Sequence, residues 1–239
     1  MSERLVIIPT YNEKENIRDI VAHVMRLAPV FDVLVVDDNS PDGTAAIVQD
    51  LGREFPGRVN LLRRPGKQGL GTAYIAGFKW ALERGHSYIF EMDADLSHDP
   101  DDLVRLYRAC AEGGADMSVG SRYVRGGRVK DWSWDRVLLS FTASLYVRMV
   151  LWLGVRDTTA GFVCYRSKVL RALPLDHIKF VGYAFQIEMK YRVRLAGFKI
   201  TEIPITFIDR RKGKSKMDSG IFKEAIIGVL RMRTRIPRR

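Results

Sequence analysis

Two aspartates with one residue between them, Asp93 and Asp95, end a largely apolar run at residues 88–92. Two carboxylates at this spacing can share one divalent cation when the backbone turns, and their hard oxygen ligands suit Mg²⁺ or Mn²⁺. Acidic pairs also cap helices, but the next helical pattern starts only at Pro100. That distance weakens the capping alternative, and the pair on its own leaves both interpretations open.

A second acidic pair, Asp37 and Asp38, ends the apolar run of residues 33–36. A carboxylate at the end of a strand can accept hydrogen bonds from a ribose or a base. The residues that follow, 39–43 (NSPDG), are also typical of a turn. Both interpretations can hold, because a turn is what positions the carboxylate.

A basic run, RRKGKSK, extends from Arg210 to Lys216 and has Gly213 as a flexible point in its middle. Mobile loops that carry Lys and Arg often become ordered on a phosphate group. The alternative is a solvated run of surface charge.

The charged side chains are distributed unevenly along the 239 residues, whose formal net charge is +11. Residues 1–119 carry 13 lysines and arginines against 19 acidic residues, a net of −6, and residues 120–239 carry 26 against 9, a net of +17. A basic half indicates a phosphate-bearing partner, which is a nucleic acid, an anionic lipid or a nucleotide.

The composition, 46% hydrophobic and 28% charged, excludes a mainly disordered chain or a collagen. Cys110 and Cys164 lack metal-binding spacing, so we expect free thiols in a reducing compartment.

Apolar runs and helical patterns alternate along the first half of the chain. This rhythm predicts an α/β fold, with a mostly parallel twisted sheet and helices on both faces. The expected strands lie at 5–8, 33–36, 59–62, 88–92 and 116–120, and the expected helices at 12–24, 44–51, 69–84 and 100–112. Pro9 is expected to end the first strand. Since open α/β sheets bind ligands outside the carboxyl ends of their strands, residues 10–13, 37–40 and 93–95 should converge on one crevice.

The second half is expected to add a second layer. Its expected elements are helices at 137–153 and 186–195, a segment at 159–166, a strand at 203–208 and a loop at 125–128. The apolar stretch 137–155 is long enough to span a bilayer, but a central Arg148 costs about 2.5 kcal/mol or more, so we expect a buried or interfacial helix. Trp132, Trp134 and Trp152 surround it and fit either a core or a membrane interface.

Four motifs, in this order and at this spacing, resemble the family 2 glycosyltransferases with the GT-A fold. They are residues 9–13 (PTYNE), 35–38 (VVDD), 93–95 (DAD) and 120–123 (GSRY). Residues 38–44 (DNSPDGT), 91–98 (EMDADLSH), 182–189 (GYAFQIEM) and 210–216 narrow the resemblance to members that make dolichyl-phosphate or polyprenyl-phosphate mannose. The resemblance covers roughly residues 4–231.

The resemblance implies a single GT-A domain over residues 1–220. Residues 1–119 would be its nucleotide-sugar and metal half, and residues 120–220 its acceptor half with the basic loop. Residues 221–239 are expected to form an amphipathic helix and a basic tail, which fit either binding at an anionic surface or packing on the domain.

The implied reaction is the inverting transfer of mannose from GDP-mannose to the phosphate of a polyprenyl phosphate, with Mg²⁺ or Mn²⁺ as cofactor. By the family pattern, the guanosine end is held by Pro9, Tyr11, Glu13, Val36 and Asp38. Asp93, Ala94 and Asp95 lie at the diphosphate; Asp95 is the main metal ligand, and Asp93 and Ser97 are further metal positions. The catalytic set is Asp95, Arg122, Arg210 and Lys216, and Arg136 and Ser140 match positions near the acceptor phosphate.

The chemistry of this reaction suits those residue types. Negative charge grows on the departing diphosphate, so a divalent cation with Arg and Lys stabilises the transition state more than the ground state. The acceptor phosphate is largely ionised at pH 7, so the reaction does not require a general base.

Two alternatives stay open. The same reaction type could use another donor such as UDP-glucose, and a basic chain could instead bind nucleic acid. The second is disfavoured because no nucleic-acid-binding module is recognisable, so nucleic acid is not among the expected partners. We expect a nucleotide sugar, a polyprenyl phosphate and a membrane surface as partners, with a membrane-anchoring protein as an additional option. The expected location is cytoplasmic, peripheral on the cytoplasmic face of a membrane.

Overall fold

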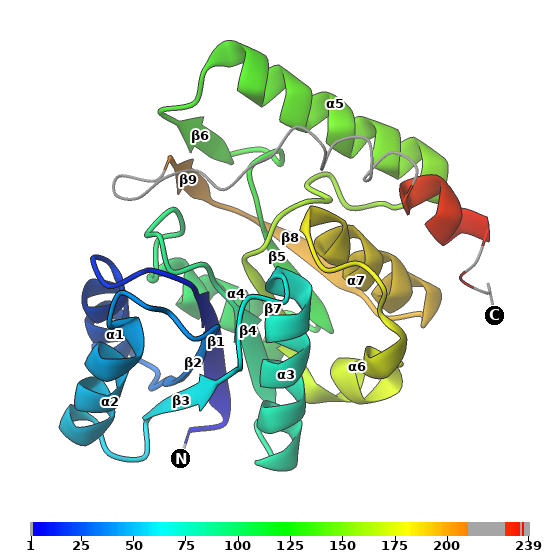
Figure 1. Ribbon diagram of the computed structural model, residues 1–239. Helices are drawn as coiled ribbons and strands as arrows, with labels where there is room; N and C mark the ends of the chain where they lie inside the picture. Colours follow the sequence, from blue (N-terminus) through cyan, green and yellow to red (C-terminus); the bar gives the residue numbers. More distant parts are fainter. Residues whose placement is uncertain (1, 210–227, 235, 237–239) are drawn as a thin grey trace.

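A seven-stranded sheet forms the centre of the computed structural model, which describes residues 2–209, 228–234 and 236 (Figure 1). The strand order is β3-β2-β1-β4-β7-β5-β8. Strand β7 is antiparallel to β4 and β5, and the other neighbouring pairs are parallel. The strands are β1 (Arg4–Thr10), β2 (Asp32–Asp37), β3 (Val59–Arg63), β4 (Tyr88–Glu91), β5 (Met117–Ser121), β7 (Val163–Arg166) and β8 (Ile200–Pro204). The predicted mostly parallel α/β fold is confirmed.

Helices cover both faces of this sheet, as the alternation of patterns predicts. One face packs against α1 (Ile17–Met25), α2 (Thr44–Glu54) and α4 (Asp102–Ala111). The opposite face packs against α3 (Leu70–Glu83), α6 (Ser167–Ala172) and α7 (Tyr183–Leu195). Every residue of β2 is buried, because this strand lies inside the sheet with helices on both sides.

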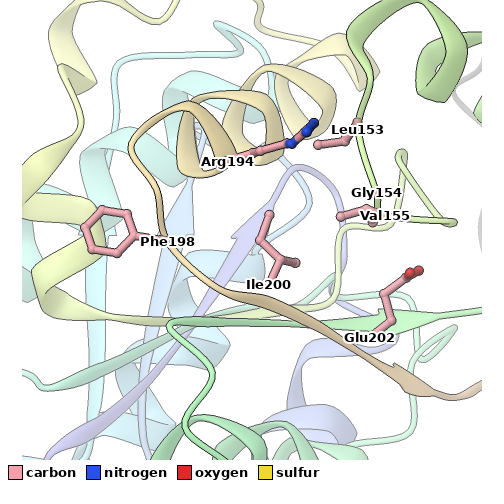
Figure 2. Close-up of a pocket in the computed structure, with 7 residues that line it drawn as sticks. All are labelled: Leu153, Gly154, Val155, Arg194, Phe198, Ile200 and Glu202. Atoms are coloured by element: carbon pink, nitrogen blue, oxygen red, sulfur yellow. The ribbon is translucent and has the colours of Figure 1, made fainter. Parts of the chain in front are cut away.

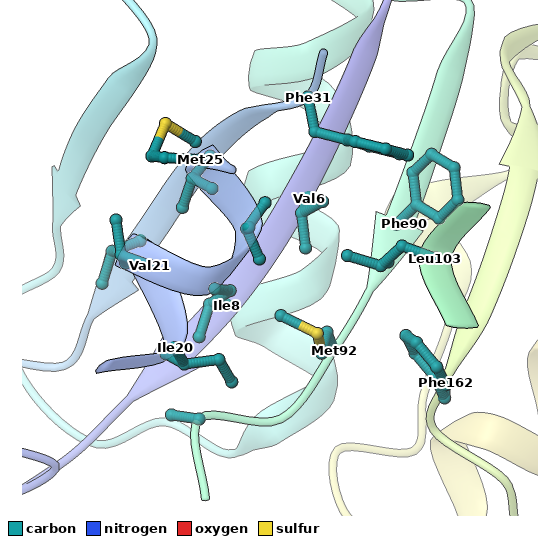
Figure 3. Packing of buried hydrophobic residues seen from close by; sticks show 14 of the residues in the cluster. Val6, Ile8, Ile20, Val21, Met25, Phe31, Phe90, Met92, Leu103 and Phe162 are labelled. Carbon is teal, nitrogen blue, oxygen red and sulfur yellow. The ribbon is translucent and has the colours of Figure 1, made fainter. Parts of the chain in front are cut away.

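The two cores follow from the alternation of side chains along each strand. In β1, Val6 and Ile8 belong to the core under α1, whereas Leu5 and Ile7 belong to the core under α3. Figure 3 shows the first of these cores, where Phe90 packs near Val6. A polar substitution at any of these four β1 positions would therefore disrupt a core.

A third, smaller core joins the outer layer to the sheet domain. Helix α5 (Trp134–Leu151) forms this layer and contributes Val147 and Leu151. They pack with Ile187 and Tyr191 of α7 and with Val229 of the helical segment 228–234. None of the helices in the described residues is both long and apolar enough to cross a bilayer. Of the predicted C-terminal helix and tail, residues 221–227, 235 and 237–239 lie outside the described residues.

The first strand continues past Pro9, although a proline was expected to end it. Ile7 accepts a hydrogen bond from the N–H of Met92, the residue after β4. Pro9 lies two residues further along β1 and faces the same side, toward β4. It lies past Glu91, which is the last residue of β4 that pairs with β1. The missing N–H of Pro9 therefore removes no ladder hydrogen bond.

The expected strand at 203–208 is instead two strands in different sheets. Strand β8 ends at Pro204, and β9 (Thr206–Ile208) pairs with β6 (Arg128–Lys130) in a separate two-stranded sheet. Strand β6 begins at the end of the segment 125–128 that was expected to be a loop. The Ile205 N–H donates to Ser121 of the main sheet, and the Ile205 carbonyl accepts from Arg128 of the small sheet, so the chain changes sheets at this residue.

Candidate active site

The ends of β1 and β2 bring three of the predicted donor residues together. Pro9 and Val36 are paired in register across the two strands. The N–H of Asp38 donates to the carbonyl of Thr10 at 3.0 Å. Pro9, Val36 and Asp38 therefore stand side by side at the carboxyl edge of the sheet, as the sequence predicts for residues of one crevice.

The other acid of this pair, Asp37, has a structural role. Its carboxylate accepts hydrogen bonds from the Thr10 hydroxyl at 2.9 Å and from the Ser40 hydroxyl at 2.6 Å. The Ser40 N–H also donates to it, at 3.0 Å. Asp37 thus builds the turn that carries Asp38, so the turn interpretation holds for Asp37.

Asp38 itself is held by Arg64, which the sequence analysis did not identify. Nε and Nη2 of Arg64 donate to the two carboxylate oxygens of Asp38 at 2.6 and 2.8 Å. Arg64 also donates to the Thr72 hydroxyl at 2.8 Å. Both charged side chains are at least nine-tenths buried. A bidentate, desolvated pair fixes the orientation of the Asp38 carboxylate.

The loops after β1 and β2 are joined by further hydrogen bonds. The N–H of Asn12 donates to the Ser40 hydroxyl, and the N–H of Glu13 donates to the Thr44 hydroxyl, each at 3.0 Å. The buried Glu13 carboxylate accepts from Asn16 at 3.1 Å. These contacts position the predicted donor residue Glu13 beside the Asp38 turn.

Tyr11, the remaining predicted donor residue of this loop, lies near a cation. Lys67 Nζ is 5.5 Å from the centroid of the Tyr11 ring. Because Lys67 precedes α3, this contact brings the loop after β1 close to the start of that helix. The lysine is therefore within the range of a cation–π interaction with the Tyr11 ring.

The predicted metal residues form a tight turn after β4. The Ser97 N–H donates to Asp95 Oδ1 at 3.0 Å, and Leu96 between them has a positive φ of 60°. Asp93 accepts from the Tyr74 hydroxyl at 3.3 Å. Both carboxylates are half-buried, whereas Ala94 and Ser97 are buried. The turn therefore follows β4 directly and holds one oxygen of the Asp95 carboxylate on the Ser97 N–H.

A buried polar network, which the sequence analysis did not assign, backs Asp93. Glu91 accepts hydrogen bonds from Gln186 and Tyr165, and burial raises its pKa to about 7. Lys190 donates to the Ala160 carbonyl at 2.6 Å, and burial lowers its pKa to about 8. The side-chain oxygen of Gln186 lies 3.5 Å from Lys190 Nζ, so Gln186 links the two charged groups.

This network reaches Asp93 through the residue after Ala160. A Cβ placed on Gly161 would lie 3.9 Å from Asp93 Oδ2 and 3.6 Å from Gln186 Nε2. Lys190 therefore holds a segment of backbone that borders the Asp93 carboxylate. Two charged residues, Glu188 and Lys190, within the largely apolar run 184–191 of α7 are the signal that could have identified this network.

Arg122, predicted to lie beside the donor, is paired with a buried carboxylate. Its Nε and Nη2 each donate to Asp157 at 2.7 Å, and Nη2 also donates to Thr159 at 3.0 Å. The side chain of Arg122 is 9% exposed and that of Asp157 is 0% exposed. Burial raises the pKa of the Asp157 carboxyl, but the charge and hydrogen bonds of Arg122 oppose this effect. The pKa of Asp157 therefore lies below its usual value.

Asp157 is held in turn by Glu202 of the edge strand β8. The N–H groups of Arg156 and Asp157 donate to the two Glu202 carboxylate oxygens at 2.8 and 2.9 Å. Glu202 also lines a pocket of about 260 Å³ whose walls come from α7, β8 and residues 153–155 (Figure 2). None of the predicted site residues lines this pocket.

His98 lies close to both Asp95 and Arg122. Its ring is stacked on Phe162 with centroids 4.8 Å apart and meets Phe207 edge-on. Burial lowers the pKa of His98 to about 4, against an opposing effect from Asp95. The ring is therefore neutral at pH 7, and its buried Nδ1 has no hydrogen-bond partner among the described residues.

The predicted acceptor residues stand on the first turns of α5. Arg136 pairs with Asp209 at 2.8 Å, and its guanidinium lies 4.0 Å from the centroid of the Trp132 ring. Ser140 is half-buried one turn further along. Arg210 and Lys216 of the predicted basic loop lie outside the described residues.

Three potential metal ligands lie within 4.8 Å of one another elsewhere in the described part of the chain, at His23, Asp99 and Asp101. This group does not include Asp93 or Asp95. The two aspartates are exposed, and Asp101 interacts with His23 Nε2 at 3.0 Å.

Comparison with known proteins agrees with this architecture. Residues 5–173 match the family described as glycosyl transferase family 2, so the chain belongs to that family and is a glycosyltransferase. It is 48% identical to polyprenol monophosphomannose synthase of Mycolicibacterium smegmatis, over 94% of this chain and 84% of that protein. It is 47% identical to undecaprenyl-phosphate mannosyltransferase of Micrococcus luteus, over 95% of this chain and 92% of that protein.

Solved structures share the fold at low sequence identity. Glucosyl-3-phosphoglycerate synthase from Mycobacterium tuberculosis, in complex with Mn²⁺, UDP-glucose and phosphoglyceric acid, superposes with a TM-score of 0.68. The identity is 17%, and the match covers 98% of this chain and 80% of that chain. A second structure of that synthase gives a TM-score of 0.69 at 18% identity, over 98% of this chain and 81% of that chain.

Proposed function

We propose that this glycosyltransferase transfers mannose from GDP-mannose to the phosphate of a polyprenyl phosphate, giving polyprenyl-phosphate β-mannose and GDP. One relationship carries the proposal. Asp38 follows β2, Asp93 and Asp95 follow β4, and these two strands flank β1. Acidic groups thus follow the two strands on either side of β1, in a chain that is 48% identical to a polyprenol monophosphomannose synthase.

The donor's guanosine end is assigned to the loops after β1 and β2. The proposed contacts are Pro9, Tyr11, Glu13, Val36 and Asp38. The Arg64–Asp38 pair supports this, because a carboxylate held by a bidentate partner is preorganised to accept hydrogen bonds from a base or a ribose. Arg64 is then a positioning residue that acts through Asp38.

The donor's diphosphate and a divalent cation are assigned to the turn after β4. Asp95 with Asp93 would hold Mg²⁺ or Mn²⁺, and Ser97 is close enough in the chain to contribute. The residues fit, because two half-buried carboxylates project from a tight turn and offer hard oxygen ligands. When bound, the cation supplies positive charge at the leaving diphosphate. Ala94 lies between the two carboxylates and contacts the diphosphate in this assignment.

The remaining catalytic charge comes from arginine and lysine. Arg122 is fixed by Asp157. In this assignment Arg122 lies beside the donor, and its cation stabilises the charge that develops on the diphosphate. Arg210 and Lys216 close on the same diphosphate in this assignment, although both lie outside the described residues. Arg136 and Ser140 would orient the acceptor phosphate, whose oxygen attacks in line and inverts the anomeric carbon.

A lipid acceptor implies a location at a membrane. We assign the enzyme to the cytoplasmic face as a peripheral protein, with a membrane-anchoring partner as an additional possibility to be tested. The basic second half, with its net charge of +17, supports contact with an anionic surface.

The donor is tested by incubating the protein with Mg²⁺ or Mn²⁺, undecaprenyl phosphate and either labelled GDP-mannose or labelled UDP-glucose, and then extracting the lipid. Label in the lipid from GDP-mannose is the expected result, and label from UDP-glucose alone would overturn the mannose assignment. Asp95→Ala should abolish transfer in a folded protein. The matched control is Asp50→Ala, at an exposed aspartate of α2, which should retain activity.

A further inference from the structure

Trp132 lies beside two arginines that the proposed function assigns to different substrates. The guanidinium group of Arg136 lies over the indole ring, 4.0 Å from its centroid, and that of Arg122 lies over the same ring at 5.4 Å. Both distances are within the range of a cation–π interaction, for which tryptophan is the best of the aromatic side chains. The two guanidinium groups are therefore no farther apart than the sum of these two distances.

The small sheet of β6 and β9 holds Trp132 in this place. Trp132 comes two residues after the end of β6, and Asp131 has a positive φ of 63° in the turn that leads from β6 to α5 (Figure 1). Phe207 of β9 is paired in register with Val129 of β6, and its ring meets the indole edge-on with centroids 5.3 Å apart. The pairing of two short strands thus fixes the position of the indole ring.

The indole N–H of Trp132 has no hydrogen-bond partner among the described residues, although its nitrogen is buried. A buried donor without a partner costs free energy, so its presence in a native structure needs an explanation. Phenylalanine at this position would avoid that cost, but its ring attracts cations less strongly. The contacts with two guanidinium groups supply the explanation, because they use the face of the indole ring and not its N–H.

The two arginines depend on Trp132 to different degrees. Arg122 is clamped by Asp157, and both of these side chains are buried. Arg136 pairs with Asp209, and these side chains are 34% and 33% exposed. An ion pair with this exposure contributes little to holding an arginine in one position. The face of Trp132 therefore matters more for the position of Arg136 than for that of Arg122.

An aromatic ring suits this place because of its charge distribution. In an in-line displacement the attacking phosphate and the leaving diphosphate approach the same carbon, so the cations that stabilise them must also lie close together. Two such cations repel each other, and a carboxylate between them would repel both phosphates. The face of an indole ring attracts both cations without carrying a net charge.

We propose that Trp132 is a positioning residue, which holds the Arg136 guanidinium at the place of the acceptor phosphate and sets its spacing from Arg122. The inference rests on the proposed function, which assigns Arg122 to the donor and Arg136 to the acceptor. It adds that the acceptor side depends on an aromatic face held by the small sheet. Trp132 acts through the two arginines, so its ring need not contact a substrate.

Steady-state kinetics with a short-chain, water-soluble polyprenyl phosphate tests this role. Trp132→Leu keeps an apolar side chain but removes the ring, so KM for the acceptor should rise about tenfold, while KM for the nucleotide sugar changes less than about twofold. Trp132→Phe restores a ring and should keep the acceptor KM within about threefold of the unaltered value. Equal rises in both KM values, or an acceptor KM as high in Trp132→Phe as in Trp132→Leu, would contradict the proposal.

Trp80→Leu is the matched control, because the Arg84 guanidinium lies over the Trp80 ring at the same distance of 4.0 Å. Trp80 lies near the C-terminal end of α3 and is not assigned to the site. This variant should keep both KM values. Cooperative thermal unfolding of both leucine variants is expected, so that a change in KM reports the position of Arg136 rather than a loss of folding.

Calorimetric titration with farnesyl phosphate, in the absence of any nucleotide sugar, separates this inference from the donor assignment. The Kd should rise about tenfold in Trp132→Leu and stay near the unaltered value in Trp132→Phe and Trp80→Leu. That pattern without transfer of mannose would support the inference and overturn the donor assignment. Transfer of mannose, with Kd and acceptor KM in Trp132→Leu equal to those of the unaltered protein, would overturn the inference.

Discussion

Both oxygens of the buried Asp157 carboxylate accept hydrogen bonds from the Arg122 guanidinium, each at 2.7 Å. The arginine that the sequence places beside the donor is therefore held by the chain itself. Its bidentate edge is engaged by Asp157, so in the proposed function Arg122 would act on a phosphate by its charge rather than as a free fork. Asp157 and Glu202, which holds the Asp157 backbone, are positioning residues for that charge.

Asp157→Asn should destabilise the protein strongly. The substitution removes the charge that compensates a buried guanidinium, which costs about 3 kcal/mol or more in the free energy of unfolding. Urea denaturation measures this quantity. The control is Glu54→Gln, which breaks the exposed Arg18–Glu54 pair and should change the free energy of unfolding by at most about 1 kcal/mol. Equal, small effects of the two substitutions would contradict the structural account of Arg122.

Arg64→Lys should weaken donor binding more than it slows turnover. Lysine keeps the positive charge but cannot make the two parallel hydrogen bonds that orient Asp38. We expect KM for the nucleotide sugar to rise about tenfold, equivalent to about 1.4 kcal/mol, with kcat changed less. The adjacent Arg63 is exposed, so Arg63→Lys is the matched control and should leave KM unchanged. A fall in kcat alone would argue against a role for this pair in binding.

Glu91→Gln should remove one component of the pH dependence of stability. Burial raises the pKa of Glu91 from 4.5 to about 7, so the folded state holds its proton more tightly than the unfolded state. The resulting stabilisation is fully present below about pH 4.5 and is lost as the pH rises through about 7. The unfolding free energy of the unaltered protein minus that of Glu91→Gln should fall across this window. The exposed Glu83→Gln should show no such fall.

His98→Phe should reduce sensitivity to acid. Burial lowers the pKa of His98 from 6.5 to about 4, so the unfolded state binds more protons between these values. Stability therefore rises with pH from about 4 to about 6.5 at this residue, and phenylalanine removes that rise while keeping the stack on Phe162. Thermal denaturation across this range measures the effect. The exposed His177→Phe is the control, and an identical acid response of the two variants would refute the burial argument.

The sequence predicted the sheet and the positions of the acidic strand ends, because both depend on local patterns. Apolar runs define buried strands, and the carboxyl ends of parallel strands share one edge, so Asp38, Asp93 and Asp95 could be placed without coordinates. The side chains that contact the buried carboxylates at these strand ends could not be predicted in this way. Arg64 meets Asp38 across 26 positions, and Gln186 meets Glu91 across 95, so these contacts depend on how β3 pairs with β2 and on how α7 packs on the sheet.

The second half was harder to predict for two physical reasons. The chain changes sheets at Ile205, where one residue pairs with Ser121 on one side and with Arg128 on the other, and no local pattern marks such a change. In α5, apolar residues occur on two faces. The sequence of α5 therefore does not reveal the division between the inner face around Val147 and the exposed face that includes Leu138 and Leu145.

The central claim is that one mannosyl group moves from GDP-mannose to a polyprenyl phosphate. Mass spectrometry of the extracted lipid, with nucleotide analysis of the aqueous phase, tests it most directly. The account predicts a lipid product heavier by one hexose that keeps a single phosphate, formed together with an equal amount of GDP. A product with two phosphates and release of GMP, or release of GDP with free mannose and no glycosylated lipid, would contradict it.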